Sequence, residues 1–373
     1  MNIPLSGPDI TKKEIEAVVS VLKTSYLSLG PKLPEFEEKF AKYIDTKYAV
    51  ALNSGTSALH LCIRALDIKD GDEVITTPFS FVASTNCFLF ERAKPVFVDI
   101  NLDTLNIDEN EIESKITKKT KAIIPVHVFG YPANMLKIRQ IAKKHNLYVI
   151  EDACEGIGAE IDKKKAGTFS DCAVFAFYPN KQMTTGEGGM LVTNNKKIAE
   201  TAKSLRNQGR DTMAWLSHNR LGYNYRLSDI NCALGLAQLD RISDLLDKRK
   251  KIAQKYNKAL AGTNEIILPP SDSDKIKRSW FVYVIRLNSS YSSKQRDHLI
   301  ELLKADGIGC NVYFPAIHLQ PYLKEYGFKK GDFLKTEAVS ERTIALPFYN
   351  KLTDKEIDYV VKRLKSNLLK VKK

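Results

Sequence analysis

The sequence predicts an α/β protein with a mostly parallel central sheet in a large domain and a smaller α+β domain at the C-terminal end. Between residues 48 and 193, short apolar segments alternate with amphipathic segments of helical period. This alternation is typical of parallel strands whose connecting helices cover both faces of one sheet. A long helix is expected from residue 229 to about residue 260, with mixed strand and helix patterns beyond it. We therefore expect a large domain over residues 1–240, including an N-terminal arm, and a small domain over residues 241–373.

The chain is expected to begin with two helices. Residues 11–22 place Ile15, Val18, Val19 and Leu22 on one helical face, and Thr11 is a suitable N-cap. A loop containing Gly and Pro separates this segment from a second helix expected at residues 34–43. Residues 48–52 then form a short apolar run, which predicts a buried strand, and a helix is expected at residues 58–66.

The remaining elements are predicted in the same way, strands from short apolar runs and helices from apolar residues at helical spacing. In the large domain, further strands are expected at residues 73–77, 95–99, 122–127, 147–150, 172–177 and 190–193. Helices are expected at residues 82–90, near residue 112, and at 133–145 and 199–205. In the small domain, we expect strands at residues 280–287 and 310–314 and helices at 293–305, 336–342 and 354–369.

Composition limits the classes of function. The 373-residue chain has a net charge of +13, mostly from Lys, but no basic stripe is interleaved with aromatic residues. A solvated surface is the favoured explanation, and no nucleic-acid partner is expected. The six cysteines stand singly, without metal or disulfide spacing, so we expect no metal and a reducing cytoplasm. No apolar run reaches transmembrane length and no signal-peptide shape is seen at the N-terminus, so no membrane association is expected.

A lysine between two expected core strands is the first candidate for chemistry. Lys181 follows an apolar run and Pro179, and precedes the loop Thr184-Thr185-Gly186-Glu187-Gly188-Gly189. Burial lowers the pKa of a lysine amine and makes it a nucleophile, which is how Schiff-base lysines arise. A solvated or salt-bridged lysine at the mouth of a loop explains the same pattern equally well, so both interpretations are open at this point.

Two further strand ends carry polar residues. The segment Ser54-Gly55-Thr56-Ser57 joins a strand to a helix N-terminus, where free N–H groups and hydroxyls can bind an anion, although Ser and Thr are also ordinary N-caps. Asp152 and Glu155 follow the strand at residues 147–150. Asp152 either caps the next turn or serves as a buried anion that keeps a ring nitrogen protonated. His127, at another strand end, is favoured as a satisfied core histidine. Ligands in such sheets bind at the carboxyl ends of strands.

These segments together resemble the DegT/DnrJ/EryC1/StrS family of sugar aminotransferases, which have the aspartate aminotransferase architecture (fold type I) and use pyridoxal 5'-phosphate (PLP). The resemblance covers nearly the whole chain, and its motifs occur in family order. The matching segments are Gly30-Pro31, Ser54-Gly55-Thr56-Ser57-Ala58-Leu59, Pro78-Phe79-Ser80-Phe81-Val82-Ala83, Glu151-Asp152-Ala153, Lys181 with Gly186-Glu187-Gly188-Gly189, Gly222-Tyr223-Asn224-Tyr225-Arg226-Leu227-Ser228-Asp229, and Leu346-Pro347.

The resemblance implies roles for the residues that match. Lys181 looks like the lysine that forms the Schiff base with PLP, and Asp152 looks like the partner of the pyridine nitrogen. Phe81 looks like the aromatic residue that stacks on the cofactor ring. The implied phosphate ligands are Gly55, Thr56, Ser57 and, reaching across from a second subunit, Asn224. The family therefore implies a homodimer with shared active sites.

At two of the matching positions, the residue type differs among members of the family. Glu155 stands where relatives have Gln, His or Glu near the 3′-oxygen of the cofactor. Ala176 stands five residues before Lys181, where the family often has a Ser that adds a hydrogen bond to the phosphate. We expect a weaker grip on the phosphate or a compensating donor, with the site retained.

The implied reaction moves an amino group from L-glutamate to a nucleotide-linked keto-deoxy sugar. The implied acceptor is a UDP-, GDP- or dTDP-4-keto-6-deoxyhexose, with C4 favoured over C3. A dehydratase, which in some relatives has His in place of the lysine, and a PLP-binding sensor are the alternatives. Four residues are candidates for contacting the sugar nucleotide through stacking or diphosphate pairing, or else for building the subunit interface: His218, Arg220, Tyr313 and His318.

Overall fold

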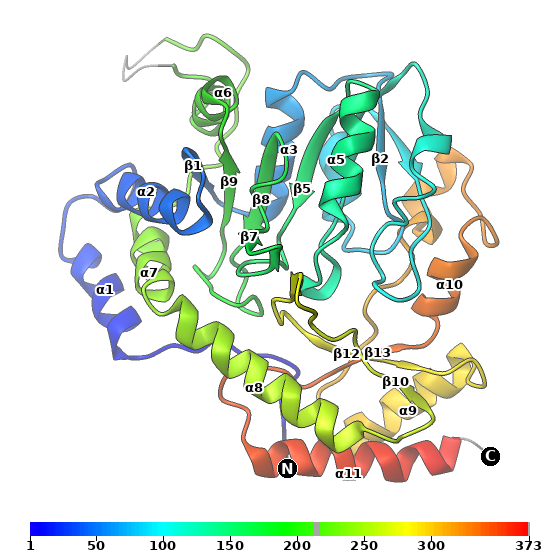
Figure 1. Cartoon of the computed structure of the whole chain (residues 1–373). Helices are drawn as coiled ribbons and strands as arrows, with labels where there is room; N and C mark the ends of the chain where they lie inside the picture. The colour runs from blue at the N-terminus through cyan, green and yellow to red at the C-terminus, as the bar shows by residue number, and fades with distance from the viewer. Residues whose placement is uncertain (212–216, 372–373) are drawn as a thin grey trace.

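The large unit is built on a seven-stranded sheet that is mostly parallel, as predicted (Figure 1). The computed structural model describes residues 1–211 and 217–371. The sheet order is β1-β9-β8-β5-β4-β2-β3, and only β9 runs against both of its neighbours. The strands are β1 Tyr48–Leu52, β2 Glu73–Thr76, β3 Lys94–Phe97, β4 Thr120–Ile124, β5 Tyr148–Asp152, β8 Cys172–Ala176 and β9 Gly189–Thr193.

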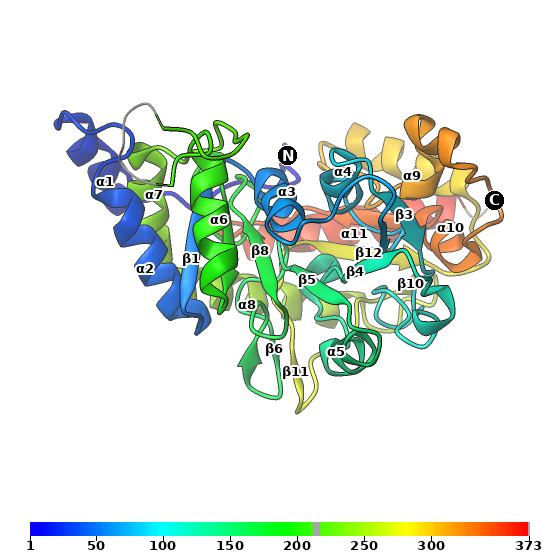
Figure 2. The ribbon, with the colours of Figure 1, turned by 90° about the horizontal axis from the view of Figure 1, so that it is seen from above.

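Helices cover both faces of this sheet (Figure 2). The central strands are apolar at consecutive positions, so their side chains supply a core on each face. One face packs against α3 (Gly55–Ala65), α4 (Ala83–Leu89) and α6 (Lys196–Arg206). The other packs against α2 (Lys32–Ile44), α5 (Met135–Lys144) and α7 (Asp229–Leu239). The polar residues at the strand ends are thereby left at the edges of a rigid layer.

The helix expected over residues 229–260 is in fact two helices, so that prediction was wrong. The first is α7, and α8 spans Ile242–Leu260, with the chain changing direction at Asp240 and Arg241. α7 packs against α2 and against α1 (Lys12–Leu22), whereas α8 runs on to the C-terminal unit (Figure 1). Arg241 forms ion pairs at the break with Asp9 and Glu14, which ties the N-terminal arm to it. The apolar period continues through the break, so sequence pattern alone did not reveal it.

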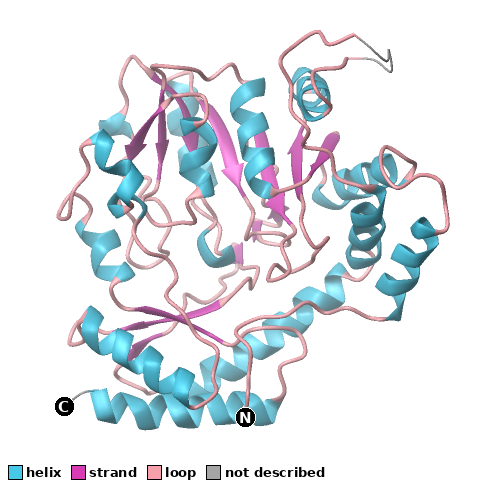
Figure 3. Ribbon diagram, turned by 180° about the vertical axis from the view of Figure 1, so that it is seen from behind, coloured by secondary structure: helices cyan, strands magenta, loops and turns pink. Residues whose placement is uncertain are grey.

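The C-terminal unit is an α+β layer built on a second sheet (Figure 3). Its strands are β10 Ile266–Ile267, β12 Tyr283–Leu287 and β13 Thr343–Leu346, and its helices are α9 Ser293–Ala305, α10 Leu334–Ser340 and α11 Asp354–Val371. The strand expected at residues 310–314 was wrong, because Asn311 makes a single bridge to Ala345 and Pro315 follows. Ile3 packs in the core of this unit, so the N-terminal arm reaches it.

Short elements complete the described chain. A third small sheet contains β6 Glu160–Ile161, β7 Lys164–Lys165 and β11 Ile276–Lys277, and 3-10 turns lie at Glu113–Lys115, Val128–Gly130, Ile317–Leu319 and Pro321–Tyr326. All six cysteines are free thiols. Within the described ranges, none of the helices combines the length and apolar character needed to span a bilayer.

A buried pair supports the sheet edge where the predicted site residues lie. His127 Nε2 lies 3.1 Å from Glu151 Oε2, and both side chains are fully buried. The N–H of Ala133 donates to His127 Nδ1, so the ring proton is on Nε2 and donates to Glu151. His127 is therefore a satisfied core histidine, the favoured sequence interpretation. Burial raises the pKa of the Glu151 carboxyl, but hydrogen bonds from His127, Gly167 and Ser170 outweigh it and leave this pKa below its ordinary 4.5.

The Glu151 carboxylate should make the protein less stable as the pH falls. A carboxyl whose pKa is lowered by folding contributes stability that is complete above its unfolded pKa, about 4.5, and is lost as the pH falls through the lower folded value. We expect Glu151→Gln to reduce the free energy of unfolding at neutral pH by about 1–3 kcal/mol, because an amide cannot accept all the same hydrogen bonds. The variant should also flatten the loss of stability below pH 4.5.

Denaturant unfolding measured from pH 7 to pH 3 checks this expectation. Glu38→Gln, at an exposed position of α2, is the matched control and should follow the wild-type curve. A Glu151→Gln protein whose stability falls as steeply with acid as that of the wild type would contradict the assignment.

Candidate active site

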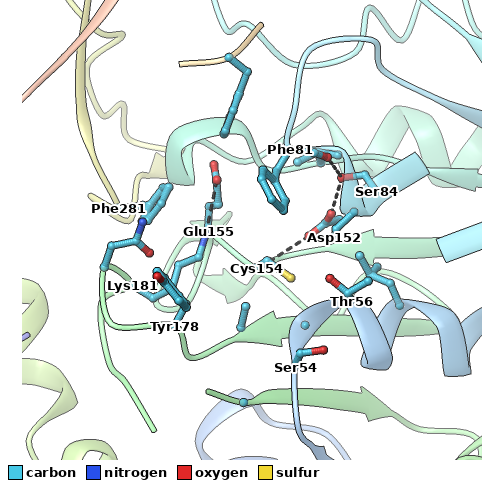
Figure 4. Close-up of a pocket in the computed structure, with 18 of the residues that line it drawn as sticks. Ser54, Thr56, Phe81, Ser84, Asp152, Cys154, Glu155, Tyr178, Lys181 and Phe281 are labelled. Carbon is cyan, nitrogen blue, oxygen red and sulfur yellow. Dashed lines mark hydrogen bonds and ion pairs between the residues drawn. The ribbon is translucent and has the colours of Figure 1, made fainter. Parts of the chain in front are cut away.

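A cavity of about 440 Å³ lies at the carboxyl ends of β5 and β8, beside the N-terminus of α3 (Figure 4). The large unit supplies most of its lining, and the C-terminal unit closes it with Phe281, Tyr313 and Phe314. Ligands of open α/β sheets bind outside the carboxyl ends of the strands. The cavity therefore occupies the position that such a fold provides for a ligand, between its two units.

Lys181 presents its amine inside this cavity. It lies in the loop after β8, where its N–H donates to the carbonyl of Tyr178 at 2.9 Å and closes a turn. Its side chain is only 13% exposed, and Nζ lies 3.5 Å from Glu155 Oε1. The same nitrogen is 3.8 Å from the centroid of the Phe281 ring. A primary amine is thus held between a carboxylate and an aromatic face, largely away from bulk water.

Glu155 is a buried residue whose carboxyl contacts both the Lys181 amine and the main chain. Its Oε2 accepts a hydrogen bond of 2.8 Å from the N–H of Phe129. Burial raises the pKa of the Glu155 carboxyl, and the nearby Lys181 amine and the Phe129 N–H offset only part of that rise. Glu155 therefore places a buried carboxyl directly beside the Lys181 amine.

Asp152 is the last residue of β5 and is 5% exposed. Its Oδ2 accepts a hydrogen bond of 2.7 Å from the Ser84 hydroxyl, and its Oδ1 accepts one of 3.2 Å from the N–H of Cys154. Ser84 in turn accepts a hydrogen bond from Ser80 at 3.1 Å. These contacts fix the orientation of the carboxylate at the cavity wall (Figure 4), where it can pair with a buried cationic N–H of a ligand.

The N-terminus of α3 forms the opposite wall. Ser54 is its N-cap and accepts the N–H of Ser57 at 3.0 Å, so the main chain of Ser57 is already engaged. Gly55 and Thr56 line the cavity, and the N–H groups of a first helical turn have no acceptor inside the helix. A Cβ on Gly55 would lie 2.8 Å from the Cβ of Ala176, so a larger residue would not fit. The wall is therefore close-fitting, and its free N–H groups could hold an anion.

Of the other predicted residues, two line the cavity. Phe81 precedes α4 and is 62% exposed, with its ring available at the mouth of the cavity (Figure 4). Tyr313 lies at the wall from the C-terminal unit, and its hydroxyl accepts a hydrogen bond of 3.5 Å from Asn180 Nδ2. Burial raises the pKa of the Tyr313 hydroxyl.

Three predicted residues lie on an exposed segment outside the cavity of this chain. His218 donates from Nδ1 to the carbonyl of Gln208 at 2.8 Å, and Arg220 pairs with Asp211 at 2.8 Å. Asn224 is exposed and forms a bridge with Asn207. None of the three is among the described residues that line the cavity.

His318 was wrong as a substrate residue. Its side chain is fully buried, and Nε2 lies 3.0 Å from Glu337 Oε1. The ring packs against Phe333 in the C-terminal unit and does not reach the cavity wall. His318 is therefore a core residue, and its sequence surroundings did not distinguish it from an exposed histidine.

Sequence reasoning missed two residues that shape the site. Ser84 holds Asp152, and its spacing of four residues from Ser80 at a helix start was the available signal. Phe281 lies just before β12, 100 residues further along the chain, and its ring contacts the Lys181 amine. No local pattern marks Phe281, since any apolar residue before a strand has the same appearance.

The family model described as the DegT/DnrJ/EryC1/StrS aminotransferase family matches residues 8–365 of the chain. The chain belongs to this family. The match takes in both units and every residue that lines the cavity, and it confirms the resemblance predicted from the sequence.

Curated relatives and solved structures agree with this membership. The aminotransferase is 43% identical to the MJ1066 protein of Methanocaldococcus jannaschii, with 97% of each chain covered. It is 38% identical to a GDP-perosamine synthase of Caulobacter vibrioides, again with 97% of each chain covered. The structure of Spr1654 from Streptococcus pneumoniae in its PLP form matches with a TM-score of 0.95 at 32% identity, covering 100% of this chain and 100% of that one. The family is PLP-dependent, and the protein is accordingly a PLP-dependent aminotransferase.

Ala176 offers a test of the phosphate cradle. Because its Cβ borders the position of Gly55 at the N-terminus of α3, Ala176→Ser would place a hydroxyl beside the cradle. A hydrogen bond to a charged group contributes about 1.5–3 kcal/mol, so we expect PLP to bind roughly tenfold more tightly or better. Titration of the apoprotein with PLP, followed by absorbance, measures the affinity.

Ala83→Ser is the matched control for that titration. Ala83 lines the same cavity from α4 and is not among the residues nearest the Gly55 position, so its added hydroxyl should leave the affinity near the wild-type value. Unchanged or weaker PLP binding by Ala176→Ser would show that the phosphate lies elsewhere.

Proposed function

We propose that the protein transfers an amino group from L-glutamate to a nucleotide-linked keto-deoxy sugar. The acceptor is a UDP-, GDP- or dTDP-4-keto-6-deoxyhexose, with amination at C4 favoured over C3. One observation carries this proposal: the Lys181 amine, the Asp152 carboxylate and the N-terminus of α3 face one cavity. The likeness to a GDP-perosamine synthase supports the sugar class.

The residues of the cavity fit PLP group by group. The α3 N-terminus, where Gly55 and Thr56 follow the N-cap Ser54, suits the phosphate, because free N–H groups and the helix dipole favour an anion. Asp152 suits a protonated ring nitrogen, and Phe81 suits the ring face. When bound, PLP supplies an electron sink that stabilises negative charge at the α-carbon of the amino donor.

Lys181 would hold PLP through its amine, and the free amine would carry the proton that leaves the α-carbon of glutamate. Proton transfer by a positioned amine contributes about 10²–10⁴-fold to the rate. The negative charge of Asp152 would keep a bound ring nitrogen protonated, and Ser84 orients the carboxylate for this by donating to its Oδ2. Glu155 Oε1 lies 3.5 Å from Lys181 Nζ, so its carboxyl would hold the amine when the amine is free.

The sugar nucleotide and the phosphate need more positive charge than this chain places in the cavity. Among the described residues that line it, Lys181 is the one cation, beside Asp152, Glu155 and Glu187. We infer a homodimer in which Asn224 of a second copy reaches the phosphate and in which His218 and Arg220 contact the nucleotide. The α1 face supports a second copy, because Ile15, Val19 and Leu22 are 57%, 40% and 55% exposed.

Tyr313 supplies an aromatic wall and a hydroxyl for the sugar end of the substrate. The six free thiols support a reducing, cytoplasmic location for the enzyme.

Replacement of Lys181 tests the proposed function. Wild-type protein loaded with PLP should show a visible absorption band that bleaches when L-glutamate is added, as the amino group moves to the cofactor. Lys181→Ala should bind PLP without forming the same band, and its exchange with glutamate should fall by at least ~10²-fold, because the proton carrier is gone. Absorbance spectra before and after glutamate measure both effects.

Lys277→Ala is the matched control, because this exposed lysine of β11 pairs with Glu160 outside the cavity. It should behave as the wild type. A wild-type band that ignores glutamate would point to a PLP-binding sensor or another donor, and normal exchange by Lys181→Ala would contradict the proposed function.

A further inference from the structure

Arg249 is a fully buried cation that the proposed chemistry does not use. It lies on α8 and is 2% exposed. No carboxylate lies within ion-pair distance of it in residues 1–211 and 217–371. Burial lowers the pKa of the Arg249 guanidinium to about 10, so it is still charged at neutral pH. Buried charges normally have a charged partner, because leaving water without one is costly.

The contacts of Arg249 lead directly to Lys181. Its Nη2 donates to the carbonyl of Lys181 at 3.0 Å, and the same nitrogen is 3.5 Å from the carbonyl of Asn180. Its Nη1 donates to the carbonyl of Phe281 at 2.9 Å. The ring of Phe281 is the one against which the Lys181 amine rests, at 3.8 Å from the ring centroid.

One guanidinium therefore joins the two segments that determine where the Lys181 amine lies. The Lys181 loop follows β8 in the large unit, and Phe281 precedes β12 in the C-terminal unit. The planar fork of Arg can donate in two fixed directions at once, whereas a Lys ammonium is a single point. A hydrogen bond to a charged donor is also stronger than one between neutral groups.

We propose that Arg249 is a positioning residue for Lys181, which clamps the main chain of Lys181 to that of Phe281 and so sets the place of the amine in the cavity. This inference rests on the proposed function, because it concerns the same amine. Arg249, a buried residue of the helix α8 that connects the two units, would thus affect the rate of amino transfer. Removing it displaces the amine, while the cofactor cradle at α3 is left in place.

Arg296 provides a matched comparison within the same chain. It is also a buried arginine, and its Nη1 donates to the carbonyl of Ser340 at 2.9 Å and to that of Thr343 at 3.4 Å. Those contacts stay within the C-terminal unit, and Arg296 does not line the cavity. It shares the burial and the carbonyl contacts of Arg249 but has no contact with Lys181, and it differs from Arg249 in that its Nε also pairs with Asp297 at 2.6 Å.

The test compares Arg249→Met, Arg249→Lys and Arg296→Met as PLP-loaded proteins. For each we would measure thermal unfolding, the pH midpoint of the visible band, and the rate and concentration dependence of bleaching by L-glutamate. Misplacement of a reacting group by about 1 Å costs on the order of 10²-fold in rate. We expect Arg249→Met to slow the maximal bleaching rate 10–100-fold, to shift the pH midpoint, and to leave the half-saturating glutamate concentration within about twofold.

Arg296→Met should lose thermal stability yet keep the wild-type rate and pH midpoint. Arg249→Lys keeps the charge but not the fork, so it should show the same defects as Arg249→Met in weaker form, and it decides the matter if Arg249→Met does not fold. A folded Arg249 variant with the wild-type rate and midpoint would overturn the proposal, as would rate losses that follow thermal stability equally in Arg249→Met and Arg296→Met. A wild type that forms no band at all would instead refute the proposed function.

Discussion

The adjacency of β5 and β8 is the constraint on which the site depends. These strands are parallel neighbours, with Asp152 directly opposite Val174, so their carboxyl ends open on the same edge of the sheet. The strand end of β5 supplies Asp152, and the loop after β8 supplies Lys181. An acid and an amine 29 positions apart in sequence thus meet without any flexible segment having to bring them together. The α3 N-terminus lies at the same edge because α3 follows β1. β1 is separated from β8 only by β9 and runs in the same direction as β8.

The C-terminal unit supplies the part of the cavity lining that the large unit does not. Phe281, Tyr313 and Phe314 line the cavity, in which the Lys181 side chain is 13% exposed and Asp152 and Glu155 are each 5% exposed. In a water-poor cavity, charges interact more strongly and an unpaired charge is more costly. The joint between the two units is therefore part of the site, and the aromatic cluster of Phe79, Phe129 and Phe314 together with Arg249 holds that joint.

The strands of the large unit, and the residues that gather at one cavity, could be predicted from the sequence because both depend on local signals. Strands buried on both faces show as apolar runs, and Asp152, Glu155 and Lys181 stand at or after the ends of such runs in the sequence. The break between α7 and α8 was not predicted, because the helical period is unbroken there and the ion pairs of Arg241 come from the distant N-terminal arm. His318 was misjudged because burial is decided by tertiary packing, here against Phe333 and Glu337.

Contacts between distant segments explain what else the sequence could not reveal. Phe281 and Arg249 contact Lys181 only after the two units have packed, and neither residue type is unusual in its own segment. Ser84 acts on Asp152 across 68 positions of sequence. Such partners require a structure, whereas a strand end followed by a reactive residue can be recognised from the chain alone.

Chemical labelling of the lysine tests the central claim most directly. The PLP-loaded wild-type protein would be reduced with borohydride and digested, and the peptide carrying the pyridoxyl group would be identified by mass spectrometry. The account predicts one labelled residue, Lys181, with labelling prevented by prior addition of L-glutamate. A pyridoxyl group on another lysine, or no stable label at all, would contradict it.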